Sequence, residues 1–251
     1  MVLPGGLPTA MLRQPCAAWL FGGFDVDVLD LDLSVARRHF GGTFSGGRQA
    51  MSDLVFYTNP QSRGRIVRWM LEEVGATYDT QVLEYGTTMK APEYLVINPM
   101  GKVPAIRHGK VVVTECAAIC AYLADAFPDA GLAPPLAERG AYYRWLFFAA
   151  GPLEAAVMNS TLGFDVPEER EVMAGYGNLA NALDTLESAL SGSAYIAGDE
   201  FTAADVYVGS QVSWGLQFGS MDKRAAFVDY AARVTDREAY RRGNELDGPM
   251  G

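Results

Sequence analysis

Histidine and positively charged residues are scarce in this sequence, and each shortage excludes a class of function. Only two histidines, His39 and His108, occur among 251 residues. They leave almost nothing from which to build a multi-histidine zinc site or a Ser-His-Asp hydrolase, so no metal is expected. The chain has 20 lysines and arginines against 30 acidic residues, a formal net charge of −10. Binding to a phosphate backbone requires the opposite balance, so nucleic acid is not an expected partner.

Cysteines and long apolar runs are scarce as well. The three cysteines, Cys16, Cys116 and Cys120, show no CxxC spacing, which argues against a disulfide scaffold and against a thioredoxin-type dithiol. This usage is typical of a reducing compartment, so we expect a cytoplasmic protein, with Cys120 as a small core residue. No run of about 18 apolar residues occurs, which argues against a membrane-spanning helix and against a membrane as partner.

Hydrophobic residues make up 49% of the chain and charged residues 20%, as expected of a folded globule with a sizeable core. Residues 1–50 differ from the rest because they are rich in glycine and carry no net charge. Their alternating segment at 24–33 has no strand with which to pair. We interpret residues 1–50 as a disordered extension or the product of a misassigned start, with Met51 opening the first foldable segment.

Hydrophobic periodicity from residue 53 onward predicts a regular order of elements. The expected elements are a strand at 54–58, a helix from 62 to 75, a strand at 78–83, a short helix at 93–97, a hairpin of strands at 104–107 and 111–113, and a helix at 115–127. After a proline-rich linker, apolar residues at helical spacing follow at 136–162, 168–190, 203–218 and 223–233. The pattern predicts an α/β domain at 51–129, an all-helical domain at 136–243 and a tail at 244–251.

Three motifs lie at the joints between these elements. Asn98-Pro99-Met100-Gly101-Lys102-Val103-Pro104, followed by Thr114-Glu115-Cys116-Ala117-Ala118-Ile119, resembles the NPxGKVP and ESxAI pair of cytosolic glutathione transferases. Gly198-Asp199-Glu200-Phe201-Thr202-Ala203-Ala204-Asp205 resembles that family's GDxxTxAD capping motif, in which threonine and aspartate form a capping box. The resemblance, which includes bacterial members, implies an N-terminal thioredoxin-like domain followed by a C-terminal helical bundle.

The same resemblance implies how glutathione, the expected co-substrate, is bound. It implies a cis Val103–Pro104 bond and a Val103 backbone that pairs with the tripeptide as an added strand. Lys102 is expected to meet the glycyl carboxylate. Glu115 and Cys116, at a helix N-terminus, suit the γ-glutamyl end. The family normally has serine in place of Cys116, and because a thiol is a weaker donor we expect looser binding. A role for Glu115 as a mere cap stays open.

A hydroxyl near the first helix is expected to activate the glutathione thiol. The free thiol has a pKa near 8.5, and lowering it by about two units takes roughly 2.7 kcal/mol, within reach of one hydrogen bond to a charged sulfur, about 1.5–3 kcal/mol. Ser62 resembles the serine-type classes of the family and is the preferred catalytic residue, although an N-cap serine is also a common helix start. Tyr57 resembles the tyrosine-type classes, and Thr58 or Asn59 is the remaining option.

The second substrate is expected between the domains, against aromatic residues of the helical half. The candidates are Tyr142, Tyr143, Trp145, Trp214 and Phe218, with Tyr142, Trp145 and Trp214 preferred. The resemblance implies a homodimeric detoxification enzyme that transfers glutathione to a small electrophile. A non-catalytic assembly module of the same fold, or a glutathione-dependent isomerase, dehalogenase or peroxidase, is the alternative. The complete NPxGKVP motif with Glu115 favours retained glutathione binding over the assembly module.

Overall fold

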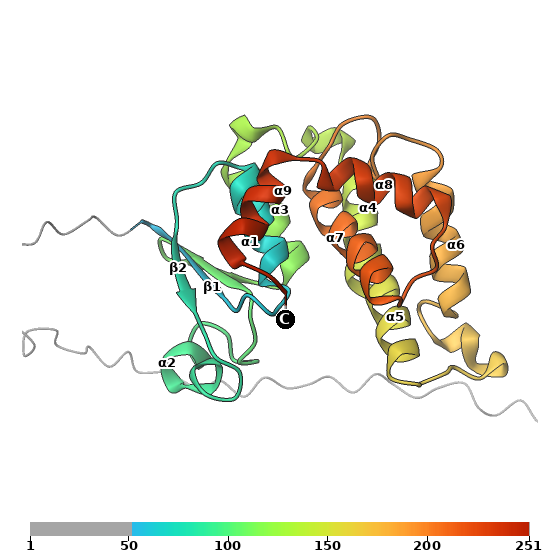
Figure 1. Ribbon diagram of the computed structural model, residues 1–251, viewed down its shortest axis with the longest axis horizontal. Coiled ribbons are helices and arrows are strands. Elements are labelled where there is room, and N and C mark those ends of the chain that lie inside the picture. The colour runs from blue at the N-terminus through green and yellow to red at the C-terminus, as the bar shows by residue number, and fades with distance from the viewer. Residues whose placement is uncertain (1–51, 251) are drawn as a thin grey trace, which may run out of the picture. The chain divides into compact units, whose positions relative to one another are not determined.

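A computed structural model describes residues 52–250 of the chain (Figure 1). The expectations for residues 1–50 and for Cys16 lie outside the described residues. Two domains follow one another along the described chain: a four-stranded sheet with its helices, and then a domain made of helices alone. This arrangement confirms the predicted thioredoxin-like domain followed by a helical bundle. No helix within residues 52–250 is long and apolar enough to cross a membrane.

The sheet has the strand order β2-β1-β3-β4, in which β1 pairs parallel with β2 and antiparallel with β3. Its strands are β1 (Leu54–Thr58), β2 (Asp79–Val82), β3 (Ala105–His108) and β4 (Val111–Thr114). All five residues of β1 are buried because helices cover both faces of this inner strand. Since side chains alternate along a strand, Phe56 joins the main core whereas Tyr57 points to the opposite face.

Two helices, α1 (Gly64–Glu73) and α3 (Cys116–Ala126), pack against each other and against the main core, whereas the short α2 (Pro92–Leu95) supplies Tyr94 to the opposite face of the sheet. In Figure 1, α1 and α3 lie between the sheet and the helical domain. Single-turn helices occur at Thr88–Lys90, Pro128–Ala130 and Leu136–Glu138. The position of α1 between the sheet and the helical domain places its first turn at the junction of the two domains.

The helical domain contains α4 (Gly140–Phe148), α5 (Glu154–Thr161), α6 (Leu179–Leu190), α7 (Ala203–Phe218), α8 (Ala225–Thr235) and α9 (Glu238–Asp247). A π-helical turn at Ala149–Leu153 that contains Pro152 joins α4 to α5, because proline removes a backbone donor from the regular ladder. The expected helix at 136–162 is therefore divided.

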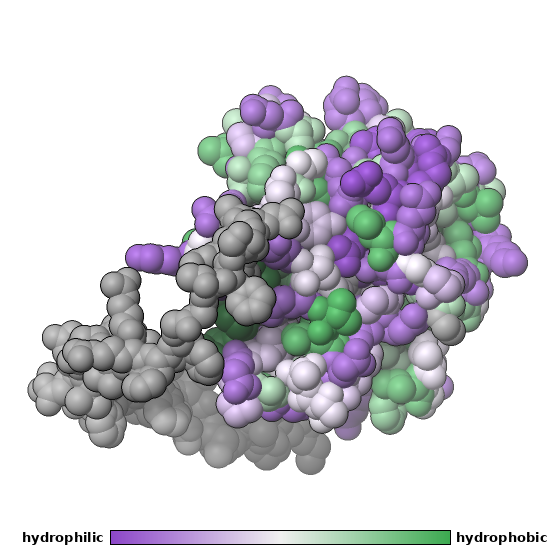
Figure 2. All heavy atoms as spheres, turned by 60° about the vertical axis from the view of Figure 1, so that its left-hand side comes forward, coloured by the Kyte–Doolittle hydropathy of each residue, from purple (hydrophilic) through white to green (hydrophobic). Residues whose placement is uncertain are grey.

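On the face shown in Figure 2, hydrophobic residues occur as separate patches among hydrophilic ones.

The expected helix at 168–190 is wrong in its first half. Residues Glu168–Met173 form a 3₁₀ segment, and α6 begins only after Gly175 and Gly177. Asn178 caps α6, since its side chain accepts a hydrogen bond from the amide of Asn181 at 2.9 Å. Glycine favours a break in the helix at this point, which apolar spacing alone does not register.

The capping box of α7 is confirmed. Thr202 accepts from the amide of Ala204, and the Asp205 side chain accepts from the Thr202 amide at 2.9 Å. Asp205 is fully buried, and its other oxygen accepts from the Ile196 amide and the Tyr230 hydroxyl, at 2.8 and 2.9 Å. These donors offset part of the cost of burying the carboxylate, which still raises the pKa of Asp205. The motif thereby joins three segments of the helical domain.

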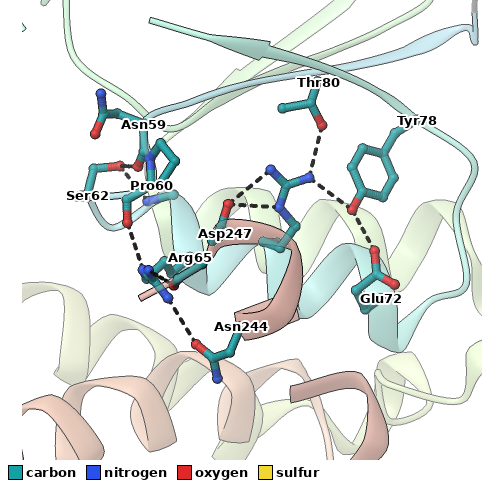
Figure 3. Close-up of polar contacts among 12 residues, drawn as sticks. Asn59, Pro60, Ser62, Arg65, Glu72, Tyr78, Thr80, Asn244 and Asp247 are labelled. Atoms are coloured by element: carbon teal, nitrogen blue, oxygen red, sulfur yellow. Dashed lines mark hydrogen bonds and ion pairs between the residues drawn. The ribbon is translucent and has the colours of Figure 1, made fainter. Parts of the chain in front are cut away.

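The expected tail at 244–251 begins too early, because α9 continues to Asp247 and packs along α1. Gly243 lies at this contact, where an added Cβ would be 3.4 Å from the Trp69 backbone. Figure 3 shows that polar side chains of both helices join in this contact. The chain end consequently lies beside the first turn of α1.

Candidate active site

A cavity of about 760 Å³ lies where the first turn of α1 faces helices α5 and α7. Ser62, Lys102 and Val103 line it from the thioredoxin-like domain. Trp214 and Phe218 of α7 line it from the helical domain, together with Val157 and Met158 of α5. One wall of the cavity is therefore polar and the other is largely apolar.

The segment before β3 is fixed in place by polar contacts. The carbonyl oxygen of Lys102 accepts from the Tyr94 hydroxyl at 2.6 Å and from Asn98 Nδ2 at 2.8 Å. The Val103–Pro104 bond is cis, as the sequence motif predicts. The backbone N–H and C=O of Val103 have no hydrogen-bond partner among residues 52–250. They are available to pair with an extended ligand.

Gly101 allows this segment to turn. Its φ is +58°, and an added Cβ would lie 2.7 Å from the carbonyl oxygen of Met89. Lys90 Nζ donates to the carbonyl oxygens of Met100 and Gly101, at 3.0 and 2.9 Å, and so fixes the same turn. Lys102 is exposed, which leaves its ammonium free to meet an anion in the cavity.

Glu115 and Cys116 occupy the start of α3, next to the cavity rather than in its lining. Glu115 is exposed and has a φ of +66°, the only positive φ of a non-glycine residue within 52–250. Such a conformation carries strain that is often found at functional positions. Cys116 is buried, its Sγ donates to the carbonyl oxygen of Arg63 at 3.6 Å, and burial raises the pKa of its thiol to about 12. Cys120 is fully buried, as expected.

Ser62 lies in the turn that precedes α1 and lines the cavity. Its hydroxyl donates to the carbonyl oxygen of Asn59 at 2.6 Å and accepts from the amide of Gly64 at 2.9 Å. Gly64 is required here, since an added Cβ would lie 1.9 Å from Thr58 Oγ1. In this arrangement the serine proton is used inside the turn, and the hydroxyl must rotate to donate to a ligand.

The alternatives to Ser62 lie outside the cavity. The Tyr57 ring packs on the far face of the sheet, 5.5 Å from the ring centre of Tyr94. Thr58 is fully buried, and its hydroxyl has no partner among the described residues. Neither residue lines the cavity. Among the three hydroxyls, the geometry therefore favours Ser62.

Two of the aromatic predictions need correction. Tyr142 and Trp145, on α4, are 1% and 6% exposed, belong to the core and do not line the cavity. The π-helical turn at 149–153 separates α4 from α5, and it is α5 that faces the cavity. Trp214 and Phe218 do line the cavity, whereas Tyr143 is exposed elsewhere.

The cavity-lining residues that sequence reasoning missed include Glu154, Gln211 and Met250. Arg63 forms an ion pair with Glu154 of α5, and Gln211 Nε2 of α7 donates to the second oxygen of Glu154 at 2.9 Å. Met250 reaches the cavity from the chain end, where Gln61 Nε2 donates to the carbonyl oxygen of Pro249 at 3.2 Å. Wide separation in sequence leaves no periodic or motif signal for these contacts.

Arg65 ties the turn that holds Ser62 to helix α9. Its guanidinium donates from Nε to the carbonyl oxygen of Pro60 at 2.7 Å and from Nη1 to Oδ1 of Asn244 at 3.2 Å. Figure 3 shows Arg65 between this turn and α9. The side chain is buried, so these bonds are shielded from water and hold the turn firmly.

The chain was compared with known proteins. It matches "Glutathione S-transferase, N-terminal domain" over residues 62–126 and "Glutathione S-transferase, C-terminal domain" over residues 136–214. Glutathione S-transferase 3 of Zea mays is 31% identical over 166 residues, covering 62% of this chain and 75% of the relative. The disulfide-bond oxidoreductase YghU of Escherichia coli is 28% identical over 225 residues, covering 78% of this chain and 77% of the relative.

Solved structures agree with these matches. A sphingomonad glutathione S-transferase complexed with glutathione has a TM-score of 0.63 and 27% identity, covering 77% of this chain and 98% of the other. The matches include the motif residues that form one wall of the cavity, at 98–104, and those at the start of α3. The chain belongs to the glutathione S-transferase family.

Proposed function

We propose that this protein is a glutathione transferase: it binds glutathione on the thioredoxin-like domain and presents the thiolate to an electrophile bound by the helical domain. The observation that carries the proposal is one cavity in which Ser62, Lys102 and Val103 lie opposite Trp214 and Phe218. A charged tripeptide suits the first wall and an apolar substrate suits the second. The two reactants would thus be brought together, which replaces an encounter in solution.

Glutathione offers two carboxylates, an ammonium and a peptide backbone, and the site has a counterpart for each. The free N–H and C=O of Val103 would pair with the backbone. Lys102 would meet the glycyl carboxylate. The first amides of α3 would donate to the γ-glutamyl carboxylate, and Glu115 would accept from its ammonium. A similar solved structure that contains bound glutathione supports glutathione as the ligand.

The protein would increase the fraction of glutathione present as thiolate, the form that attacks electrophiles. We propose Ser62 as the hydrogen-bond donor to the sulfur. Its hydroxyl would rotate away from the Asn59 carbonyl, and one bond to a charged sulfur, about 1.5–3 kcal/mol, would lower the pKa of the thiol by about one to two units. We further propose a cytoplasmic homodimer, by analogy with the family.

A second candidate is glutathione-dependent reduction of disulfides, because a relative that covers 78% of this chain is named a disulfide-bond oxidoreductase. In that reaction the glutathione thiolate attacks one sulfur of a disulfide, forms a mixed disulfide and releases the other sulfur as a thiolate. Activation of the glutathione sulfur would be the same. Only the group bound at the apolar wall would differ.

Calorimetric titration of the full chain with glutathione tests binding, and assays with chlorodinitrobenzene and with hydroxyethyl disulfide then test the two reactions. We expect saturable binding and turnover with at least one substrate. Turnover of the disulfide alone would select the second candidate. Absence of both heat of binding and retention on glutathione resin would contradict both candidates and favour a non-catalytic assembly module.

A further inference from the structure

Arg63 extends from the turn of Ser62 toward the helical domain. Its guanidinium pairs with Glu154 of α5, and the two side chains are 44% and 27% exposed. Gln211 of α7 holds the same carboxylate at 2.9 Å and lies 3.3 Å from the Tyr207 hydroxyl. Arg63, Glu154 and Gln211 all line the cavity. The guanidinium of the residue that follows Ser62 is thus part of the cavity lining and is paired with a carboxylate of the helical domain.

The Ser62 hydroxyl already donates within its own turn, so a further hydrogen-bond donor to the glutathione sulfur would be useful. The serine proton is bonded to the Asn59 carbonyl at 2.6 Å, so stabilising an anion costs the turn one of its own hydrogen bonds. A guanidinium has five N–H donors, and Glu154 is the side-chain partner of Arg63 in the described chain. Arg63 can therefore bind a second anion without giving up its first.

A purely structural role explains this arrangement less well. Half-exposed ion pairs contribute little to stability, and this one is not shielded as Arg65 and Arg68 are. The charge of Arg63 also acts on a sulfur at this end of the cavity. Burial raises the pKa of the Cys116 thiol, the nearby charge of Arg63 lowers it in part, and the charges of Glu154 and Glu115 raise it further.

We propose that Arg63 is a second thiolate-stabilising residue for bound glutathione, and that Glu154 acts as the counter-ion that limits its effect. The inference rests on the proposed function, which places the glutathione sulfur beside Ser62. On binding, the thiol would release its proton to solvent, and the sulfur anion would bind the guanidinium. Glu154 would remain held by Gln211. Arg63 would then be a catalytic residue, and its ion pair with Glu154 would be more than a structural link between the two domains.

The proposal predicts opposite effects of two substitutions on the thiol of bound glutathione. Arg63→Gln removes the cation and should raise the pKa of that thiol by about one unit, at the low end of what a nearby opposite charge causes. Glu154→Gln removes the competing anion and should lower it by roughly half a unit. The titratable and charged groups that surround this end of the cavity are Arg63, Tyr85, Lys90, Lys102, Glu115, Cys116, Glu154 and Tyr207. The other groups are the same in both variants.

The test is thiolate absorbance against pH in the glutathione-saturated full chain, with calorimetry and thermal melting of each variant. Arg63→Lys keeps the charge and should restore most of the shift. Arg144→Gln removes an exposed charge of α4 that does not line the cavity, and should leave the titration unchanged. Opposite shifts would support the proposal if glutathione affinity at about pH 5, where the thiol is protonated in every variant, stays within about two-fold. A purely structural role of Arg63 would leave the pKa of the thiol unchanged in both variants.

Other outcomes would overturn it. Shifts of the same sign in Arg63→Gln and Glu154→Gln, no shift in either, or an equal shift in Arg144→Gln would each assign Arg63 a structural role. In those cases the wild-type chain would still bind glutathione, and the proposed function would stand. Absence of binding by the wild-type chain would instead contradict both proposals.

Discussion

Arg68 of α1 and Asp247, the last residue of α9, form a buried ion pair in which Nη2 and Oδ1 lie 3.0 Å apart. The side chains are 7% and 0% exposed. Arg68 also donates to the hydroxyls of Tyr78 and Thr80, at 3.2 and 2.9 Å, so one guanidinium joins α9, α1 and the strand β2 (Figure 3). The chain end is therefore fastened beside the turn that carries Ser62.

We expect Asp247→Ala to destabilise the fold strongly. It leaves the Arg68 guanidinium buried without its counter-charge, and breaking one side of a buried pair costs about 3–5 kcal/mol. The free energy of unfolding in urea measures the loss. Asp236→Ala is the matched control, because its pair with Arg241 is exposed and should contribute only about 0–1 kcal/mol. Equal losses in the two variants would contradict the structural role of Asp247.

The Arg68–Asp247 contact illustrates why part of the fold was not predictable from the sequence. Periodicity predicts elements, and it located every strand of the sheet and the helices α1, α3 and α7. It does not predict that two charges 179 residues apart meet. A carboxylate near a chain end is usually solvated, and α9, with its many charged residues, has no apolar run that marks a packed helix. The tail was predicted too early for that reason.

The residues of the candidate site likewise fall into a group that the sequence predicts and a group that it does not. Lys102, Val103 and Glu115 were predictable because a local motif fixes a turn and a helix start. The apolar wall was not, because an amphipathic segment does not say which of its faces meets a ligand. Tyr142 and Trp145 were assigned to the pocket on type alone, but the π-helical turn puts α5 against the cavity instead.

Substitution of two tryptophans separates the cavity from the core. Trp214→Ala should raise the KM for chlorodinitrobenzene about ten-fold, since a ring contact of about 1.4 kcal/mol is lost. Trp145→Ala should leave that KM nearly unchanged but lower the free energy of unfolding by about 3–5 kcal/mol, because Trp145 is a core side chain. Steady-state kinetics and urea unfolding distinguish the two, and the reverse result would restore Trp145 to the pocket.

Cys116 should resist alkylation in the folded chain. Burial raises the pKa of its thiol from 9.0 to about 12, and only the thiolate reacts. At pH 9 we expect iodoacetamide to modify the Cys116 peptide at least about a hundred-fold faster in urea than in buffer, by mass spectrometry. Similar rates in urea and buffer would show that the thiol is accessible.

The raised pKa of Cys116 also determines the direction in which the free energy of unfolding changes with pH. The folded chain favours the protonated thiol, so the contribution of this group is fully present below pH 9.0 and is lost as the pH rises through about 12. Cys116→Ala should therefore flatten the fall in unfolding free energy over this range. An unchanged slope would mean that other groups, such as buried tyrosines, dominate the alkaline transition.

Glu115→Gln should weaken glutathione binding more than it changes stability. Glu115 is exposed at the start of α3, and its proposed partner is the γ-glutamyl ammonium. Loss of that charge-assisted bond should cost about 1.5–3 kcal/mol, or roughly 10- to 150-fold in affinity by calorimetry. Glutamine keeps the backbone conformation with φ of +66°, so an unchanged affinity would assign Glu115 to helix capping alone.

Ser62→Ala should raise the pKa of bound glutathione by about one to two units, because a bond of about 1.5–3 kcal/mol to the sulfur anion is lost. Turnover at neutral pH should fall roughly ten- to a hundred-fold, in line with the smaller thiolate fraction. Glutathione affinity at about pH 5, where the thiol is protonated in both variants, should change little, since Val103, Lys102 and Glu115 hold the tripeptide. Thiolate absorbance against pH in the saturated complex gives the pKa, and thermal melting reports the loss of the turn bonds to Asn59 and Gly64.

Tyr57→Phe is the comparison that decides the assignment of Ser62. Its ring packs against Tyr94 on the far face of the sheet, so removal of its hydroxyl should leave the titration unchanged. A large shift in Tyr57→Phe without one in Ser62→Ala would reject Ser62 as the donor and leave glutathione binding intact. A shift in neither variant would transfer the activation of the sulfur to Arg63 and the first amides of α1, whose combined field does not depend on either hydroxyl.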